Sequence, residues 1–292
     1  MSKVWLVTGS SRGLGRALAD AVLAAGHRLV ATARKTADLA DLASRHREKL
    51  RAVALDVTDA AAARAAVAAA KEAFGRLDVV VNNAGYANVC SIEDAPLEDF
   101  RAQVETNFFG VVNVTRAALP VLRAQRSGHI IQISSVGGRL GSPGLAAYQS
   151  SKWAVGGFSE VLAKEVGPLG IRVTVVEPGG MRTDWAGASM RIDPFNPDYQ
   201  PSVGAFSQAA RGRAEDMRGD PSKVAQVVVR LVAEKDPPLR ILLGTDAVFL
   251  GRVMSENRAE EDAKWAEVGR STDFDGMIDF ADTPVAAMFR RR

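Results

Sequence analysis

From Val4 to Val176, short runs of apolar residues alternate with longer stretches in which apolar residues recur at helical spacing. The apolar runs predict six β-strands, at Val4–Thr8, Arg28–Ala33, Arg51–Leu55, Val79–Asn82, His129–Ser134 and Arg172–Glu177. Each run is nearly continuous, which is typical of strands buried on both faces. The intervening stretches predict helices near residues 13–26, 36–49, 59–75, 97–126 and 147–168. This alternation predicts an α/β fold, a doubly wound parallel β-sheet flanked by helices on both faces.

The regular pattern breaks between residues 179 and 220, a segment rich in Gly, Pro and aromatic residues. Beyond it, the pattern predicts a helix over Ser222–Glu234, a strand over Leu239–Leu243 and a last helical region after Thr245. The tail is too short to build a separate core. We therefore expect a single domain, with residues 1–250 as its body and residues 251–292 as a C-terminal extension.

Composition narrows the class of protein. The chain has 292 residues, is 47% hydrophobic and carries 37 basic against 34 acidic side chains, a net charge of +3. This surplus is too small to indicate nucleic-acid binding, and no apolar run approaches the roughly 18 residues of a membrane span. Cys90 is the single cysteine, which excludes an intrachain disulfide and fits a reducing compartment. A strand pattern from Lys3 leaves no room for a signal peptide, so we expect a cytoplasmic protein.

A glycine-rich loop follows the first predicted strand and precedes a predicted helix. It reads Thr8-Gly9-Ser10-Ser11-Arg12-Gly13-Leu14-Gly15. Glycines at such a place let the backbone approach a pyrophosphate at the helix N-terminus. The spacing G-x-x-x-G-x-G departs from the general G-x-G-x-x-G pattern, and a tight turn without a ligand is the alternative interpretation.

The end of the second predicted strand indicates which dinucleotide would bind. An NAD site usually places an acid about 20 residues after the glycines, where it accepts from the ribose 2′-OH. Here the strand ends in Ala33-Arg34, and Arg12 lies in the glycine-rich loop. Two arginines would attract a 2′-phosphate, so we expect NADP (NADPH). Two solvated surface arginines are the alternative.

Tyr148 and Lys152 stand four residues apart at the start of a predicted helix and so share one face. A neighbouring ammonium favours the phenolate and lowers the tyrosine pKa. Tyr148 could then give a proton to a carbonyl or take one from an alcohol. An ordinary surface pair is the alternative.

Taken in order, these motifs resemble the short-chain dehydrogenase/reductase family over roughly residues 3–245, which implies a Rossmann-like fold. Asp56-Val57 resembles the family's segment that holds the adenine. Pro178-Gly179, followed by Thr183, resembles the segment that binds the nicotinamide amide. Asn82-Asn83-Ala84-Gly85 resembles the family's motif after the fourth strand. The implied cofactor-binding residues are Gly9, Ser11, Arg12, Gly13, Leu14, Gly15, Arg34, Asp56, Val57, Asn83, Ala84, Gly85, Tyr148, Lys152, Pro178, Gly179 and Thr183.

The same resemblance implies a catalytic set of Asn107, Ser135, Tyr148 and Lys152. Ser135 precedes Tyr148 by 13 residues, the family's spacing, which favours it over Ser134. Its hydroxyl would polarise the substrate oxygen, and the family's asparagine holds a water that links the lysine to solvent. The segment near residues 180–220 lies where the family builds a substrate lid.

We therefore expect an NADP(H)-dependent oxidoreductase that interconverts a ketone or aldehyde and the corresponding alcohol. The expected substrate is a small, apolar molecule, because the lid holds Trp185, Phe195, Tyr199 and Phe206. An epimerase or dehydratase on this scaffold, or a non-catalytic NADP-sensing module, are the alternatives. No metal site is expected, because the three histidines lack ligand spacing.

The helix near residues 147–168 carries more apolar residues than a single sheet-facing stripe needs: Trp153, Val155, Phe158, Val161 and Leu162. Members of the family commonly pair through this helix and the one near 97–126. A homodimer or homotetramer is expected. Apolar residues of the C-terminal extension could instead cover this face or the substrate cleft.

Overall fold

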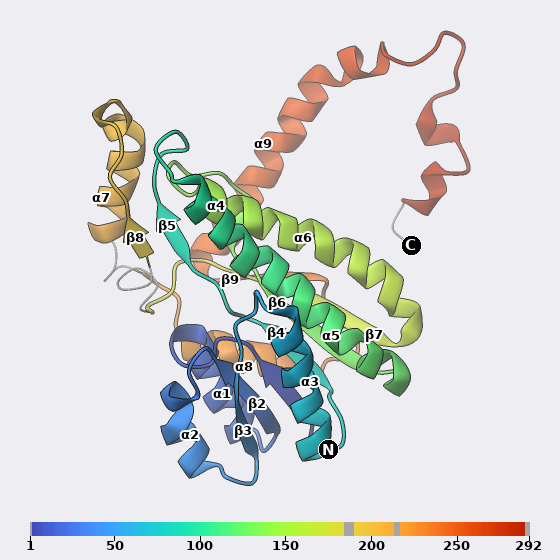
Figure 1. Cartoon of the computed structure of the whole chain (residues 1–292). Helices are drawn as coiled ribbons and strands as arrows, with labels where there is room; N and C mark the ends of the chain where they lie inside the picture. The colour runs from blue at the N-terminus through green and yellow to red at the C-terminus, as the bar shows by residue number, and fades with distance from the viewer. Residues whose placement is uncertain (1, 184–189, 213–216, 290–292) are drawn as a thin grey trace. The chain divides into compact units, whose positions relative to one another are not determined.

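The computed structural model describes residues 2–183, 190–212 and 217–289. Seven strands form one parallel sheet in the order β3-β2-β1-β4-β6-β7-β9 (Figure 1). Their bounds are β1 Val4–Val7, β2 Arg28–Ala33, β3 Leu50–Ala54, β4 Val79–Asn82, β6 Gly128–Ile133, β7 Ile171–Pro178 and β9 Arg240–Leu243. The predicted Rossmann-like, doubly wound sheet is confirmed, and the predicted strand ends lie within two residues of the observed ones.

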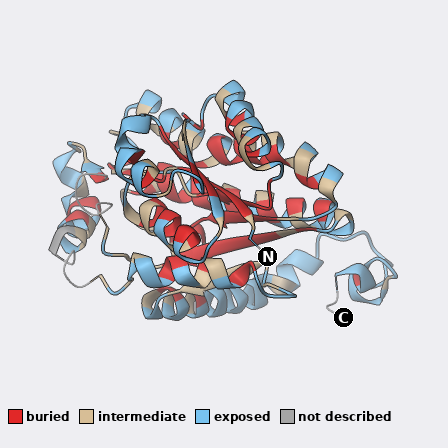
Figure 2. Ribbon diagram, turned by 90° about the horizontal axis from the view of Figure 1, so that it is seen from below, coloured by how far each residue is buried: buried red, intermediate tan, exposed pale blue. Residues whose placement is uncertain are grey.

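Helices cover both faces of the sheet. The helices α1 (Gly13–Ala24) and α8 (Pro221–Leu231) pack together on one face. The other face is covered by α3 (Ala60–Phe74), α5 (Gly110–Gln125) and α6 (Ala146–Val166). Successive residues of a strand point to opposite faces, and the buried residues of the sheet therefore enter two separate cores (Figure 2).

The alanine-rich stretch before residue 75 is a regular helix. Asp59 caps α3, since its Oδ1 accepts from the backbone N–H groups of Ala61 (2.7 Å) and Ala62 (3.1 Å). Gly75 ends the helix at φ +78°, a conformation that favours glycine. Asp220 caps α8 in the same way.

Two helices that the pattern predicts as continuous are divided. The stretch 36–49 forms a 3₁₀ turn, Thr36–Leu39, and a short helix α2, Ala40–Arg45. The stretch 97–126 forms α4 (Leu97–Val104), a π-helical turn (Glu105–Phe109) and α5. The π turn adds a residue to the turn that carries Asn107, and such turns are frequent at functional sites.

The pattern also missed a second, two-stranded sheet. Strand β5 (Ala87–Val89) pairs in parallel with β8 (Met190–Ile192). A 3₁₀ turn, a π-helical turn and helix α7 (Ala205–Gly212) follow β8. The described part of the expected lid therefore has regular structure, while residues 184–189 and 213–216, Trp185 included, lie outside the described residues.

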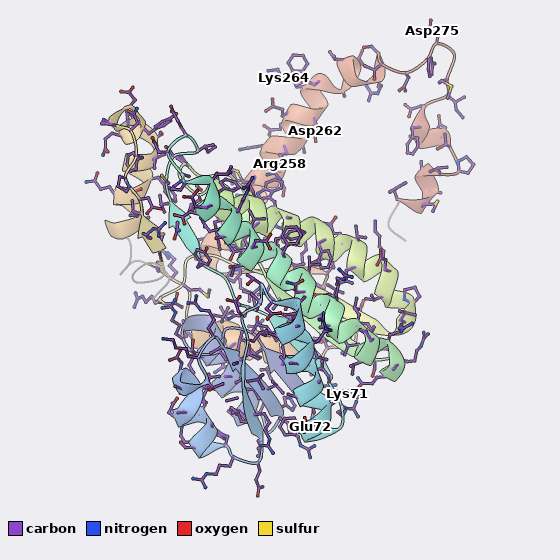
Figure 3. All side chains as sticks on the ribbon, in the orientation of Figure 1. Lys71, Glu72, Arg258, Asp262, Lys264 and Asp275 are labelled. Atoms are coloured by element: carbon purple, nitrogen blue, oxygen red, sulfur yellow. The ribbon has the colours of Figure 1, made fainter. Side chains whose placement is uncertain are left out.

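The chain divides into two compact units, residues 1–251 and 252–292. Helix α9 (Thr245–Arg270) begins in the first unit and continues into the second, where Arg258, Asp262 and Lys264 project from it (Figure 3). The second unit exposes large apolar side chains, among them Trp265, Phe274, Met277, Ile278, Phe280, Met288 and Phe289. Among the described helices, none is long and apolar enough to cross a membrane.

Candidate active site

The glycine-rich loop between β1 and α1 depends on its glycines. Gly9 has φ +68° and Gly13 has φ +54°, in the region that favours glycine. A Cβ atom on Gly15 would lie 2.0 Å from the carbonyl oxygen of Gly9 and 2.5 Å from Nδ2 of Asn83. The backbone at the start of α1 is therefore open to a ligand's phosphates, as a dinucleotide requires.

Asn83, directly after β4, fastens this loop. Its Nδ2 donates to the carbonyl oxygens of Thr8 (2.9 Å) and Gly9 (3.2 Å). In return, Thr8 Oγ1 accepts from the backbone N–H groups of Asn83 (2.9 Å) and Ala84 (3.0 Å). Strands β1 and β4 are neighbours in the sheet. The strand order runs outward from β1 in one direction and from β4 in the other, and ligands of such folds bind at this switch point. Thr8 is a positioning residue that the sequence analysis did not single out.

The ends of β2 and β3 present the residues expected around the adenosine. Arg34 directly follows β2, and both Arg34 and Arg12 have exposed side chains. Asp56 Oδ1 accepts from the backbone N–H (3.0 Å) and hydroxyl (2.7 Å) of Thr58. These hydrogen bonds lower the pKa of Asp56, and the nearby charge of Arg34 lowers it further. Val57 and Leu14 are buried beside this region, and Ser11 is half-buried.

Tyr148 and Ser135 are in contact. Tyr148 is buried at the start of α6, and burial raises its pKa, while a hydrogen bond with the Ser135 hydroxyl acts in the opposite direction. The lower pKa expected from the neighbouring Lys152 is therefore not found, because burial outweighs the groups that favour the phenolate. Ser135 Oγ also accepts from the backbone N–H of Gly137 at 3.0 Å. Ser134 instead donates to the carbonyl oxygen of Lys152 at 3.3 Å. Of the two serines, the one with the expected spacing therefore contacts the tyrosine.

Lys152 lies one helical turn beyond Tyr148 and is buried. Its Nζ donates to the carbonyl oxygen of Ile133 at 2.8 Å and lies 5.7 Å from the centroid of the Tyr148 ring. Burial disfavours the ammonium form and lowers the pKa of Lys152 to about 8.

Asn107 faces Lys152 across a glycine. Its Oδ1 accepts from the backbone N–H of Tyr86 (3.0 Å), and its Nδ2 donates to the carbonyl oxygen of the same residue (2.8 Å). A Cβ atom on Gly85 would lie 2.8 Å from Asn107 Oδ1 and 3.7 Å from Lys152 Nζ. The structure therefore brings together all four residues of the expected catalytic set.

The segment after β7 returns to the glycine-rich loop. Pro178 ends β7, and Gly179 donates from its N–H to the carbonyl oxygen of Leu243 at 2.9 Å. A Cβ atom on Gly13 would lie 3.6 Å from Thr183 Cβ, so Thr183 contacts the loop. Gly180 donates to Asp246 Oδ2 at 2.8 Å. The sequence did not indicate this role of Asp246, because Asp246 lies in α9, 66 residues after Gly180.

An apolar cluster surrounds Tyr148. Its other buried members come from β5, β8, the segment after β8 and the residue before α6: Ala87, Val89, Met190, Val203 and Leu145. Phe195, Tyr199 and Phe206 pack against them. Three of the four aromatic residues of the expected lid therefore pack against the cluster that includes the tyrosine, and Trp185 is outside the described residues.

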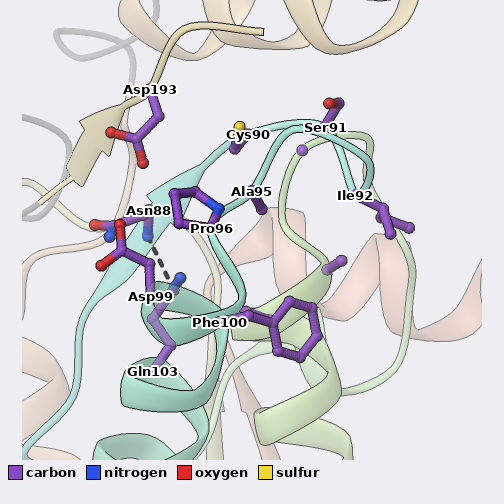
Figure 4. Close-up of a pocket in the computed structure, with 13 residues that line it drawn as sticks. Asn88, Cys90, Ser91, Ile92, Ala95, Pro96, Asp99, Phe100, Gln103 and Asp193 are labelled. Atoms are coloured by element: carbon purple, nitrogen blue, oxygen red, sulfur yellow. Dashed lines mark hydrogen bonds between the residues drawn. The ribbon is translucent and has the colours of Figure 1, made fainter.

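A small pocket of about 20 Å³ lies between α4, β5 and the start of α6 (Figure 4). Its lining includes Phe100, Cys90, Gln103 and Asn88, and Gln103 Oε1 accepts from the backbone N–H of Asn88 at 3.0 Å. Burial raises the pKa of the Cys90 thiol, which disfavours the reactive thiolate. In the part of the chain that the structure describes, His, Cys, Asp and Glu form no group of three that could hold a metal ion.

Comparison with known proteins agrees with this arrangement. The sequence model of the short chain dehydrogenase family matches residues 3–191. The oxidoreductase BOA17 of Botryotinia fuckeliana is 52% identical over 269 residues, 92% of this chain and 98% of that protein. A short-chain dehydrogenase structure from Streptomyces avermitilis has a TM-score of 0.88 and 39% identity, covering 94% of this chain and all of the other. An alcohol dehydrogenase from Thermococcus sibiricus, complexed with 5-hydroxy-NADP, has a TM-score of 0.69 and 26% identity, covering 83% of this chain and 96% of the other.

The chain belongs to the short-chain dehydrogenase/reductase family. It is an oxidoreductase of the kind that uses a nicotinamide cofactor.

Proposed function

We propose that this protein is an NADP(H)-dependent oxidoreductase that interconverts a ketone or aldehyde and the corresponding alcohol. The observation that carries the proposal is the hydrogen bond between Ser135 and the buried Tyr148, with Lys152 on the same face of α6. NADPH, when bound, supplies the hydride that is transferred to the carbonyl carbon.

Tyr148 has the environment of a proton donor. Its burial raises the pKa of the phenol, so the proton stays on Oη until a substrate oxygen gains negative charge. The Ser135 hydroxyl, held beside Oη, donates to the same substrate oxygen and stabilises that charge. Lys152, as an ammonium, favours the tyrosinate that remains and so eases the proton transfer. Asn107 lies near the same glycine, Gly85, as Lys152, where it would hold a water that links the lysine to solvent.

The residues proposed to hold the cofactor are those around the glycine-rich loop and the ends of β2, β3, β4 and β7. They are Gly9, Ser11, Arg12, Gly13, Leu14, Gly15, Arg34, Asp56, Val57, Asn83, Ala84, Gly85, Pro178, Gly179 and Thr183, together with Tyr148 and Lys152. The preference for NADP over NAD rests on Arg34 and Arg12, because both guanidinium groups are exposed and β2 ends without an acid.

The proposed substrate is a small molecule with an apolar body next to its carbonyl group. The apolar cluster around Tyr148 supports this choice, since Val89, Leu145 and Met190 would meet that body. A strongly charged substrate would lose its hydration there without a partner.

We further propose a cytoplasmic homodimer or homotetramer with no nucleic-acid or membrane partner. Two apolar side chains on the outer face of α6 support the assembly: Trp153 is 42% exposed and Val161 57% exposed. Phe109, the last residue of the π-helical turn before α5, is 44% exposed. Such a patch is typical of a symmetric contact between copies.

A panel of ketones and aldehydes, assayed with NADPH and with NADH, tests the activity. We expect stoichiometric NADPH consumption and formation of the alcohol from at least one apolar carbonyl compound. Net conversion of a substrate without net cofactor oxidation would indicate an epimerase or dehydratase instead. Tight NADPH binding without turnover of any panel member would indicate a sensing module.

A further inference from the structure

A network of four charged side chains adjoins the candidate active site. The carboxylate of Glu177, the residue before Pro178, is fully buried (0% exposed). Its Oε2 accepts from Arg139 Nε at 2.8 Å, and its Oε1 accepts from Arg240 Nη1 at 2.8 Å. Arg240 also pairs with Glu160 through Nη2 at 2.7 Å. Two positive and two negative charges balance, so the buried carboxylate is fully compensated.

Each arginine ties a different element to Glu177. Arg240, on β9, packs against α6 so closely that a Cβ atom on Gly156 would lie 2.7 Å from its Nη2. Gly156 is one helical turn beyond Lys152 and two beyond Tyr148, so Arg240 lies against the helix that carries both. Arg139 lies on the other side, at the end of the turn that begins with Ser135.

This turn, Ser135–Arg139, is called the serine turn below. Within it, Gly138 donates to the carbonyl oxygen of Ser135 and Arg139 to that of Val136, both at 2.9 Å. These local bonds set its shape, and it follows the end of β6 rather than belonging to the sheet. The turn also packs against α6, since a Cβ atom on Gly138 would lie 3.0 Å from the carbonyl oxygen of Lys152. The contact from Arg139 to Glu177 holds its far end to β7.

Glu177, by contrast, is held by the sheet. Its backbone is in β7, where the neighbouring Val176 pairs with Ile133 of β6 and Glu177 itself pairs with Leu242 of β9. Removing the Glu177 carboxylate would leave this strand paired but would remove its contacts with Arg139 and Arg240, and Arg240 would stay paired with Glu160. The effect of such a change is therefore directed at the serine turn.

We propose that Glu177 is a positioning residue that holds the serine turn through Arg139 and so aims the Ser135 hydroxyl at the substrate oxygen. The proposal rests on the proposed function, because it assigns Ser135 a part in that reaction. It extends the site to a carboxylate that touches neither substrate nor cofactor.

A second buried carboxylate in the chain provides a matched control. Asp78 precedes β4, and its Oδ1 accepts from Arg76 Nε at 2.9 Å. Its side chain is 8% exposed, and its Oδ2 also accepts from the backbone N–H of Val4 at 2.8 Å. It lies at the edge of the sheet where the strands begin, whereas Ser135 and Glu177 lie where they end. Asp78→Asn and Glu177→Gln each remove one buried charge, but only the second lies next to the serine turn.

The first experiment measures amide hydrogen exchange in the two variants, without substrate. We expect Glu177→Gln to speed the exchange of Gly138 and Arg139 about 10-fold or more relative to wild type, and Asp78→Asn to leave these amides unchanged. Equal rates in all three proteins would overturn the proposal, whether or not the chain reduces a carbonyl. Arg139→Gln leaves Glu177 paired with Arg240 and should show the same faster exchange as Glu177→Gln. It replaces Glu177→Gln in the experiment if that variant does not fold.

The second experiment compares turnover on the best substrate of the panel. Glu177→Gln should lower kcat about 10- to 100-fold, because misplacing a polarising group by a fraction of an ångström is costly. The same change made in a Ser135→Ala background should lower kcat less than about twofold, since the group it positions is gone. Full additivity of the two changes would overturn the proposal. A wild-type protein without turnover would contradict the proposed function alone, and the exchange rates would still decide the role of Glu177.

Discussion

Gly85 and Asn107 approach each other so closely that no side chain fits between them. A Cβ atom on Gly85 would lie 2.8 Å from Asn107 Oδ1, and Lys152 Nζ is 3.7 Å from the same point. The φ of Gly85 does not require glycine, so the requirement comes from this contact and not from the backbone. The motif after β4 therefore keeps the asparagine and the lysine within reach of each other.

Gly85→Ala is expected to displace Asn107 and lower kcat about 10-fold or more, because Lys152 loses its support. The overpacking should also lower the free energy of unfolding by about 1–3 kcal/mol. Steady-state kinetics and urea unfolding measure the two effects.

Gly157→Ala on α6 is the control for this substitution. A Cβ atom there meets no atom within 4 Å, and the residue is exposed. The change should leave kcat unchanged. Light scattering checks that the assembly is intact, because Gly157 lies one helical turn from both Trp153 and Val161 on the face proposed for the contact. Equal kinetic effects of the two alanine variants would contradict the role assigned to Gly85.

Arg34→Asp tests the choice of cofactor. The substitution replaces an attraction to a 2′-phosphate with a repulsion, so NADPH should bind about 10- to 100-fold more weakly, or about 1.5–3 kcal/mol. NADH should bind nearly as before. Titration calorimetry with both cofactors gives the two dissociation constants. Arg64→Asp, the same charge change at an exposed position of α3, should alter neither constant. Equal losses for both cofactors in Arg34→Asp would show that Arg34 does not contact the 2′-phosphate.

The buried Lys152 predicts a pH dependence of stability. Burial lowers its pKa to about 8 from an ordinary 10.5, so between these values the unfolded chain binds a proton that the folded chain does not. Stability therefore rises with pH across this window by up to about 3 kcal/mol from this group. Lys152→Met lacks this contribution.

The comparison is made by urea unfolding of the two apo proteins at pH 7 and pH 10. The free energy of unfolding of the wild type, measured relative to Lys152→Met, should increase from the lower to the higher pH. The opposite trend would mean that the folded protein holds the ammonium more tightly than water does.

Val161→Glu tests the proposed assembly. Val161 is 57% exposed on α6, so the charge costs little in a monomer but would be desolvated in a symmetric contact. Light scattering at micromolar concentration should show a dimer or tetramer for the wild type and a single chain for the variant. A wild-type protein with the mass of one chain would contradict the assembly.

The main sheet and its helices could be predicted because each element carries its own apolar periodicity. Every predicted strand was confirmed, from Val4 in β1 to Leu243 in β9. The pair β5–β8 could not be predicted, because each strand has three residues and their partners are about a hundred residues apart. The π turn at Asn107 was missed because it leaves the helical pattern almost unchanged.

The candidate site likewise has residues that the sequence predicted and residues that it did not. Tyr148, Lys152, Ser135 and Asn107 were expected from spacing and resemblance, and the structure brings them together. Their roles remain predictions. The charge network of Glu177 left no trace in the pattern, because nothing local pairs a buried glutamate with arginines 38 and 63 residues away.

Tyr148→Phe gives the most direct test of the proposed reaction. The substitution keeps the ring within the apolar cluster but removes the hydroxyl that contacts Ser135. Measured on the best carbonyl substrate with NADPH, kcat should fall about 100- to 10,000-fold, while the dissociation constant for NADPH should change less than about 10-fold, the effect of one lost hydrogen bond to the cofactor. Near-normal turnover in Tyr148→Phe would contradict the assignment of this tyrosine as the proton donor and, with it, the proposed mechanism.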